Sequence, residues 1–276
     1  MTSKKNNYLM INQAPGYLFV DLVRAACSYN NKICIIVGEI PDGIPDGVEI
    51  KLLNSYNRNG NLNRFISWVL FTIRSSLYIF FRRKNISSIL CVTNPPLLLA
   101  FLPFFNIPYS ILLYDMYPQI LAATNIIDRK SLVYRLLNQI ICRAYRQSHY
   151  IFPLSHAMLS ELNNQCGDIS KARVVPLWHN MKVKKVGLES EINVFERFEI
   201  SASFIVVYAG NFGSTHPLED IIEASDFLLD EDIHILLVGG GAKEKLLKRR
   251  SIHRVNVTIL PFQNEFRVLK RIKSLD

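Results

Sequence analysis

The sequence predicts an α/β protein with two doubly wound parallel sheets in tandem, the second of them incomplete. Short apolar, β-branched runs alternate with helical stretches along nearly the whole chain, as in sheets that are covered on both faces. Two successive runs in the second half end in glycines, at the edge where open α/β sheets bind ligands. A length of 276 residues allows two modest domains with hydrophobic cores.

The chain opens with a strand, a glycine turn and a helix. The strand is expected at 8–12, the turn ends in Gly16, the helix covers 17–29, and a second strand follows at 33–37. The basic start has no long apolar core and no small-residue cleavage site, so it does not have the pattern of a signal peptide. Gly16 therefore follows the carboxyl end of the first strand.

An apolar and aromatic segment at 65–81 comes next. It contains Arg74 and two serines, and basic residues flank it, whereas a membrane-spanning helix needs about 20 apolar residues with few charges. The segment therefore predicts a core helix of the first domain. The alternative is a helix whose apolar face also enters the membrane interface.

Two further strands are expected at 86–92 and 109–114, separated by a short helix among breaker residues. Asp115 directly follows the second of these strands, so its carboxylate is expected at the same sheet edge as the preceding turns. The alternative for Asp115 is a capping role in a turn or helix.

The rest of the first half continues the alternation. A helix at 132–147, a strand at 150–154 and a helix at 156–162 capped by Ser155 are expected, and residues 172–176 end the pattern. Residues 181–201 are polar, charged and without strong periodicity. We therefore place the first domain at 1–180, a connection at 181–201 and the second domain at 202–276.

The second domain begins with a strand that runs into a glycine loop. The apolar run 204–208 predicts a strand buried on both faces, Gly210 and Gly213 follow, and Pro217 suits the first turn of a helix. Backbone N–H groups at such a corner bind phosphate or another anion. The spacing is neither a dinucleotide fingerprint nor a P-loop, and a tight strand-to-helix turn without a ligand is the alternative.

A second unit of the same kind follows. A helix at 218–229 leads to a strand at 233–238, three glycines from Gly239 to Gly241, a Lys-rich helix at 242–250 and a strand at 255–260. Two successive strands that end in glycine place small residues along one carboxyl edge. The sequence therefore predicts a ligand site at that edge.

The charge of the chain favours an anionic partner. Its 32 Lys and Arg against 23 Asp and Glu give a net charge of +9, which suits phosphates, nucleic acid or an anionic membrane surface. No interleaved basic and aromatic signature and no zinc-finger spacing is present, which argues against nucleic acid.

The five cysteines are odd in number, scattered and mostly set among apolar neighbours. They predict reduced core thiols in a cytosolic protein. No C-x-x-C pair is present, so no metal site is expected.

The order of these pieces resembles that of retaining GT-B glycosyltransferases of family four, in particular the bacterial enzymes of O-antigen, capsule and exopolysaccharide synthesis. The resemblance implies two tandem Rossmann-like domains and covers nearly the whole chain. It rests on the segments 93–96, 115–118, 153–155, 175–180, Gly210 to Gly213 with His216, Gly239 to Gly241, and 261–262.

The resemblance also implies where the substrates bind. A nucleotide-sugar donor, UDP- or GDP-linked, would lie on the second domain with its diphosphate at Gly210, Asn211, Gly213, His216, Gly239 and Gly240. Gly16 would lie near the donor phosphates across a cleft, and Asp115 would lie close to the reacting sugar. Neither metal nor cofactor would be required. The acceptor would be a lipid-linked saccharide, and the enzyme would be cytoplasmic and peripheral on the inner face of the plasma membrane. The apolar segment and its basic neighbours, 65–84, predict the contact with anionic lipid.

Two departures from the family pattern matter. Relatives place an Arg and a Lys in the first loop of the second domain, whereas this loop has Ser214, Thr215 and His216, with Lys243 as a substitute from the next helix start. His216 is also an acceptable helix N-cap. The family's pair of glutamates seven residues apart would follow Asp276, so the sequence predicts a C-terminally truncated chain.

Three functions fit the sequence. The first is a glycosyltransferase of polysaccharide assembly. The second is an inactive remnant, or one half of a split enzyme that acts only as a binding module, which the missing glutamates favour. The third is another nucleotide-sugar enzyme such as a two-domain epimerase, which the segment 115–118 disfavours.

Overall fold

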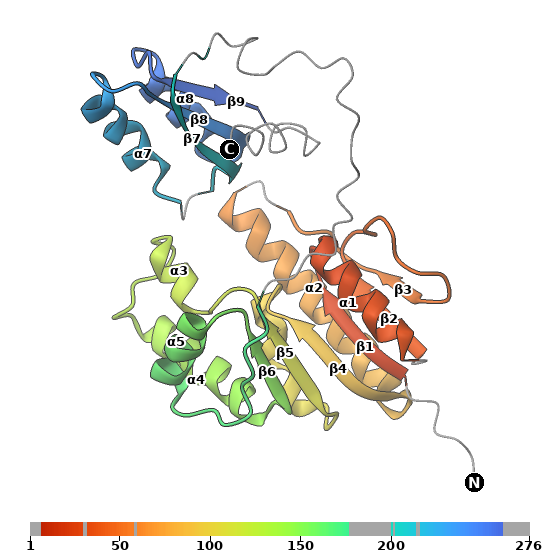
Figure 1. Ribbon diagram of the computed structural model, residues 1–276. Coiled ribbons are helices and arrows are strands. Elements are labelled where there is room, and N and C mark those ends of the chain that lie inside the picture. Colours follow the sequence, from red (N-terminus) through yellow and green to blue (C-terminus); the bar gives the residue numbers. More distant parts are fainter. Residues whose placement is uncertain are drawn as a thin grey trace. The chain divides into compact units, whose positions relative to one another are not determined.

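Two separate parallel sheets organise the chain, one in each of the units Met1–Lys182 and Val183–Asp276 (Figure 1). The computed structural model describes residues 7–29, 32–57, 60–176, 200, 202–213 and 216–261. The expectations for residues 177–180, 214–215 and 262–276, and for the connection apart from residue 200, lie outside the described residues. The domain limits therefore stay predictions.

The sheet of the first unit has six parallel strands in the order β3-β2-β1-β4-β5-β6. They are β1 Asn7–Asn12, β2 Lys32–Val37, β3 Glu49–Leu52, β4 Ile86–Val92, β5 Tyr109–Leu113 and β6 Tyr150–Pro153. Five of them confirm the strands expected from the sequence. The strand β3 was missed, because four residues that alternate polar and apolar at a sheet edge leave no apolar run.

Helices connect these strands and cover both faces of the sheet (Figure 1). They are α1 Tyr17–Ser28, α2 Asn61–Arg82, α3 Gln119–Ala123, α4 Leu132–Gln147 and α5 His156–Cys166, with short 3₁₀ turns η1 Arg83–Asn85, η2 Pro96–Ala100 and η3 Leu102–Phe104. The hydroxyl of Ser155 accepts the N–H of Met158 at 3.1 Å, which confirms the predicted cap of α5.

The core of this unit has two parts because successive strand residues point to opposite faces. On one face Ile11, Ile89 and Ile111 pack against α2, η2, α4 and α5, and on the other face Met10 and Leu112 belong to the cluster that contains the α1 side chains. This two-sided burial is the physical meaning of the predicted doubly wound sheet.

Among the described residues, the sheet of the second unit has three parallel strands in the order β7-β8-β9. Its elements are β7 Phe204–Asn211, α7 Leu218–Ala224, η4 Ser225–Leu228, β8 Ile233–Gly240, α8 Glu244–Ser251 and β9 Val257–Leu260. The expectation that 204–208 is buried on both faces is wrong: Phe204 is 62% exposed, and β7 is an edge strand of the described sheet. The buried strand is β8, which has a partner on each side.

The expectation that all five cysteines are reduced is also wrong. Cys142 on α4 and Cys166 at the end of α5 form a disulfide, whereas Cys27, Cys34 and Cys91 are free. The two bonded residues are 24 positions apart in the sequence, and only the packing of α4 against α5 brings them together. Burial raises the pKa of the free Cys91 thiol to about 12.

We expect reduction of the disulfide to lower the free energy of unfolding by about 2–4 kcal/mol, because the unfolded chain regains the freedom of a long loop. Denaturant unfolding with and without dithiothreitol measures the effect. A Cys142→Ser/Cys166→Ser variant should show no response to reductant, and equal midpoints for the oxidised and reduced wild type would contradict the expectation.

Candidate functional site

The two glycine stretches of the second unit meet at one edge of its sheet. Gly210 is in register with Gly239, and Asn211 with Gly240, at the carboxyl ends of β7 and β8. The strand β7 runs through Gly210 to Asn211, so it ends three residues later than the strand expected at 204–208. The predicted convergence of the glycines at a carboxyl edge is present.

Close approach of the two strands explains the glycines of β8. A Cβ on Gly239 would lie 1.8 Å from the carbonyl oxygen of Gly210, and its φ of +156° is also unfavourable for other residues. A Cβ on Gly241 would lie 2.5 Å from Oδ1 of Asn211. Any side chain at these two positions would push β7 away.

His216 ties the loop back to β7. Its Nδ1 lies 2.7 Å from the carbonyl oxygen of Asn211 and 3.0 Å from the hydroxyl of Tyr208, which itself donates to the Asn211 carbonyl oxygen. The N-cap of α7 is Pro217, so the N-cap role considered for His216 is wrong. The contact of Tyr208 with His216 was not predicted, because a tyrosine within a β-branched run is typical of an ordinary strand.

Lys243 has a carboxylate partner. Its Nζ donates to Oε2 of Glu219 at 2.7 Å and to the carbonyl oxygen of His216 at 2.8 Å, and the two side chains are 18% and 19% exposed. The hydrogen bond from Lys243 lowers the pKa of Glu219. Lys243 thus holds the loop to the start of α8, and a diphosphate would have to share its charge with Glu219.

The first unit offers a second carboxyl edge with Gly16 and Asp115. Gly16 is the N-cap residue of α1, and a Cβ there would meet no atom within 4 Å. Asp115 follows β5, and its N–H and that of Tyr114 donate to Oγ1 of Thr93, at 3.1 Å each. That both residues face one cleft with the glycines of the second unit stays a prediction.

The carboxylate of Asp115 is half-buried and unpaired. It makes no hydrogen bond or ion pair with the residues that the structure describes, and the N-cap of α3 is Pro118, so Asp115 caps no helix there. Burial raises its pKa. A desolvated carboxylate without a partner is the kind of group found in functional sites.

An aromatic cluster contains Tyr117, two residues after Asp115. The ring of Trp68 stacks with Tyr56 at 6.2 Å and meets Tyr117 edge-on at 6.0 Å between centroids. Burial raises the pKa of Tyr117 most, Asp115 raises it further and Arg64 lowers it, so both charges lie near the Tyr117 hydroxyl. From the sequence, Trp68 was expected only as part of a core helix.

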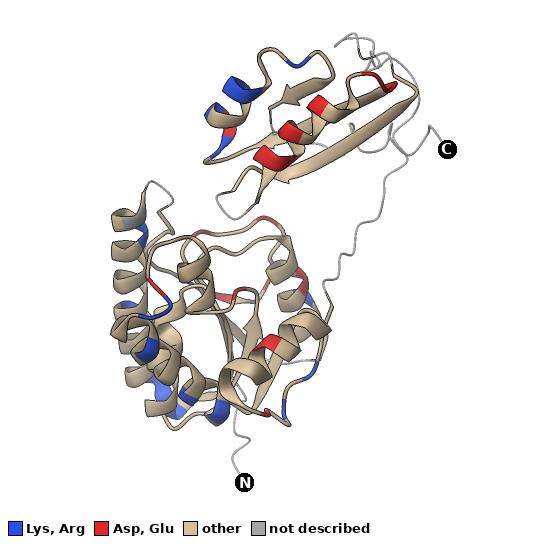
Figure 2. Cartoon of the chain, turned by 90° about the vertical axis from the view of Figure 1, so that its left-hand side faces the viewer, with Lys and Arg blue, Asp and Glu red and all other residues tan. Residues whose placement is uncertain are grey.

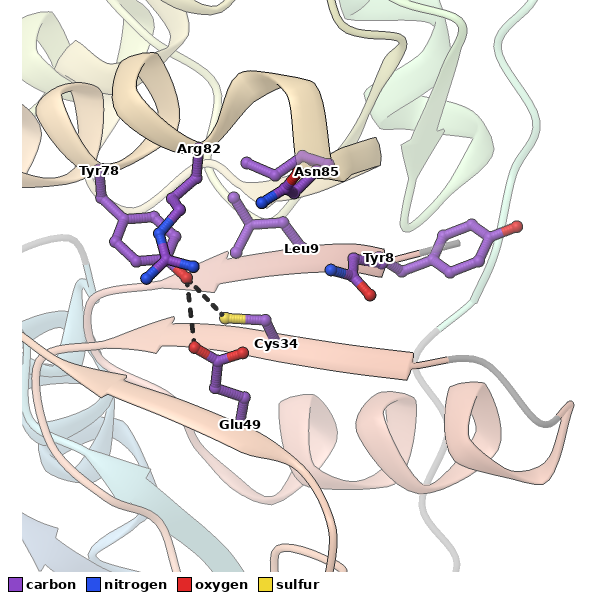
Figure 3. Close-up of a pocket in the computed structure, with 9 residues that line it drawn as sticks. Tyr8, Leu9, Cys34, Glu49, Tyr78, Arg82 and Asn85 are labelled. Atoms are coloured by element: carbon purple, nitrogen blue, oxygen red, sulfur yellow. Dashed lines mark hydrogen bonds between the residues drawn. The ribbon is translucent and has the colours of Figure 1, made fainter. Parts of the chain in front are cut away.

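A small cavity lies at the opposite, amino edge of the same sheet (Figure 3). It has a volume of about 30 Å³, enough for about one water molecule. The hydroxyl of Tyr78 lies 3.5 Å from both Sγ of Cys34 and Oε1 of Glu49. Its position away from the carboxyl strand ends separates it from the candidate site.

Known proteins resemble the chain mainly in fold. No family model matches. A probable glycosyltransferase, WbjE of Pseudomonas aeruginosa, is 20% identical over 224 residues, which cover 79% of this chain and 56% of that protein. The chain therefore spans little more than half the length of this curated relative.

Solved structures match nearly the whole chain. HepE of Anabaena in complex with UDP-glucose has a TM-score of 0.62 and 15% identity, over 95% of this chain and 71% of that one. WaaG, a glycosyltransferase involved in lipopolysaccharide biosynthesis, has a TM-score of 0.63 and 13% identity, over 95% and 72%. The chain thus has the GT-B fold of these glycosyltransferases, as the sequence predicts, with a smaller second sheet.

Proposed function

We propose that the chain is a retaining glycosyltransferase that moves a sugar from a UDP- or GDP-sugar to a lipid-linked saccharide in O-antigen or capsule assembly. One observation carries the proposal: the carboxyl ends of β7 and β8 pair through glycines, in a fold shared with a protein solved with UDP-glucose. Backbone N–H groups at such corners suit phosphates.

The donor diphosphate would lie at this corner. Gly210, Gly239 and Gly240 keep side chains away, Asn211 and Gly213 flank the turn, and His216 is held against β7. Lys243 would supply positive charge from the start of α8. These contacts need neither metal nor cofactor.

Substitutions of Lys243 and Glu219 test whether the donor diphosphate binds at the ends of β7 and β8. We expect Lys243→Gln to weaken UDP binding about tenfold, because a charge-assisted hydrogen bond is lost. Glu219→Gln should strengthen binding a few-fold, since the competing carboxylate disappears. Calorimetry with UDP measures both, and Glu223→Gln on the same helix is the matched control. Unchanged affinity in Lys243→Gln would remove Lys243 from the site.

Asp115 would support the reacting sugar. Glycosyl transfer develops positive charge at the sugar, and an unpaired, desolvated carboxylate stabilises such charge more strongly than one in water. The ionised form is the useful one. Because burial raises the pKa of Asp115, this form is lost on acidification at a higher pH than for an ordinary aspartate.

We expect Asp115→Asn to lower kcat by about a hundredfold or more. The wild type should lose activity on acidification with an apparent pKa above about 3.9, and the variant should lose this acid limb. A transfer assay with a panel of UDP- and GDP-sugars and a lipid-linked acceptor, run from pH 4 to 8, measures both. Full activity of Asp115→Asn would refute the assignment.

A nucleotide-binding module without turnover is the second candidate. Lys243, the cation expected at the corner, is already bound to Glu219, so phosphate binding there should be weak. The same assay separates the two candidates, because UDP affinity without sugar transfer would select the second.

We propose that the protein is located at the anionic inner surface of the plasma membrane. The helix α2 with η1 is long and apolar enough to cross a membrane by length and composition, but a third of its apolar 18-residue window is buried inside the protein. Its outer side exposes a row of large apolar side chains. They are Leu62, Phe65, Ile66, Leu70, Ile73, Leu77, Phe80 and Phe81, and we call them the apolar stripe.

Charge supports a peripheral location. No Asp or Glu occurs between residues 51 and 114, while Arg82, Arg83 and Lys84 lie exposed at the end of the stripe. Figure 2 shows Lys and Arg gathered toward one end of the helices of the first unit. The Cys142–Cys166 disulfide is unusual for a reducing cytoplasm, so its redox state in intact cells, trapped by alkylation before lysis, also tests this location.

We expect the chain to sediment with vesicles containing phosphatidylglycerol and to be released by salt, which screens charge over about 10 Å at 0.1 M. Phe81→Gln should weaken this binding about tenfold, as expected for the loss of a buried aromatic side chain. Phe227→Gln, at a similarly exposed position in the second unit, should not. Binding that resists both salt and alkali would show an integral segment instead.

A further inference from the structure

The helices on the α2 side of the first sheet form one layer with an apolar outward surface. Buried side chains of α2, η2, η3 and α4 belong to one core cluster, and η2 packs against both α2 and α4. The four elements therefore turn their exposed side chains away from the sheet. The apolar stripe, on the outward side of α2, is only one part of this surface.

The 3₁₀ turns and α4 supply the other part. Phe101 and Phe104 are exposed beside α2, and Leu132, Val133 and Leu136 are exposed at the start of α4. Residues four and seven apart share one side of a helix, so the exposed side of α4 continues from Leu132 through Leu136 to Arg143. Large apolar side chains thus extend across the layer beyond the stripe.

Two exposed aromatic rings of this layer each carry a guanidinium group. The guanidinium carbon of Arg83 lies 5.0 Å from the ring centroid of Phe80, and that of Arg143 lies 5.4 Å from the ring centroid of Phe104. Both distances fit cation–π contacts. Neither arginine forms an ion pair with a carboxylate of the described residues. Each pair therefore presents an apolar ring and an uncompensated positive charge at one place.

Both pairs lie toward the amino edge of the sheet. The helices α2 and α4 end shortly before β4 and β6 begin, and η3 ends shortly before β5 begins. Because the strands are parallel, their first residues meet at one edge. The gathering of Lys and Arg at one end of these helices in Figure 2 agrees with this placement.

Charge complementarity identifies the partner of this surface. No Asp or Glu occurs between residues 51 and 114 or between residues 129 and 160, the two segments that contain the four elements. A second copy of the chain fits poorly, since a two-fold interface would bring the same positive side chains together. An anionic bilayer suits both components, because acyl chains surround the rings and lipid phosphates pair with the guanidinium groups.

We propose that η3 and α4 form a second lipid contact beside the apolar stripe, in which the Phe104 ring enters an anionic bilayer and the Arg143 guanidinium binds lipid phosphates. The Phe80–Arg83 pair is the counterpart on α2. Two contacts on separate elements of one layer orient the protein, with this layer against the bilayer. The proposal rests on the membrane location proposed above and extends it to residues that only the folded chain brings together.

Sedimentation of the full chain with phosphatidylglycerol vesicles tests the contact. We expect Phe104→Gln to weaken binding about tenfold and Arg143→Gln about fivefold. Raising the salt concentration should reduce the effect of Arg143→Gln more than that of Phe104→Gln, since salt screens charge. Thermal midpoints show whether the variants are folded.

The second unit supplies matched controls. Phe204 is 62% exposed against 65% for Phe104, and Arg249 is exposed and has no ion pair among the described residues. Phe204→Gln and Arg249→Gln should therefore change vesicle binding less than about twofold. Losses in these controls equal to those in Phe104→Gln and Arg143→Gln would overturn the contact.

Fluorescence quenching shows whether position 104 enters the bilayer. Phe104→Trp adds an indole at the proposed contact, and its emission above the wild-type signal should be quenched by vesicles of lipids brominated in the acyl chain. Phe204→Trp is the matched control and should not be quenched. A Phe104→Trp variant that sediments with vesicles but is not quenched would overturn the insertion of this ring.

The outcomes separate this contact from the other proposals. Weaker binding in Phe81→Gln but not in Phe104→Gln or Arg143→Gln would overturn the second contact and leave the stripe. Self-association without lipid that Phe104→Gln abolishes would make a second copy the occupant, and no sedimentation of the wild type would overturn both membrane contacts. A chain that binds vesicles through Phe104 but transfers no sugar would refute the proposed function and leave this surface standing.

Discussion

Parallel strand pairing is the constraint on which both candidate edges depend. Because all strands of a parallel sheet run the same way, residues that follow different strands meet at one edge. In the second sheet this register sets Gly210 opposite Gly239, and their close approach leaves no room for a side chain on Gly239. In the first sheet it brings the Thr93 hydroxyl to the backbone N–H groups of Tyr114 and Asp115.

The two edges differ in how their charges are compensated. At the second sheet Lys243 is bound to Glu219, so the cation is neutralised and stiffens the loop. At the first sheet neither Asp115 nor Arg64 has an ionic partner in the described part of the chain. Shielded charges without partners lower stability, and sites that bind or react with ligands are where proteins commonly keep them.

The helix α2 meets two environments at once. Trp68, Phe71 and Ile79 are buried in the first unit, while Phe65, Leu70 and Leu77 on other sides of the helix are exposed. A helix that is apolar nearly all round is expected in a core or in a membrane. Here one side is buried in protein and the other is exposed, and the proposed membrane location rests on this exposed side.

The sequence by itself determined the order and type of nearly all strands and helices, the glycine corner and the position of Asp115, because apolar runs, breakers and strand ends are local patterns. It missed β3, a four-residue edge strand, and overestimated the burial of β7. The tertiary structure alone decided which side chains meet. The Cys142–Cys166 disulfide, the pairing of Lys243 with Glu219 and the neighbourhood of Arg64 and Asp115 join residues far apart in the sequence, and local patterns do not specify such contacts.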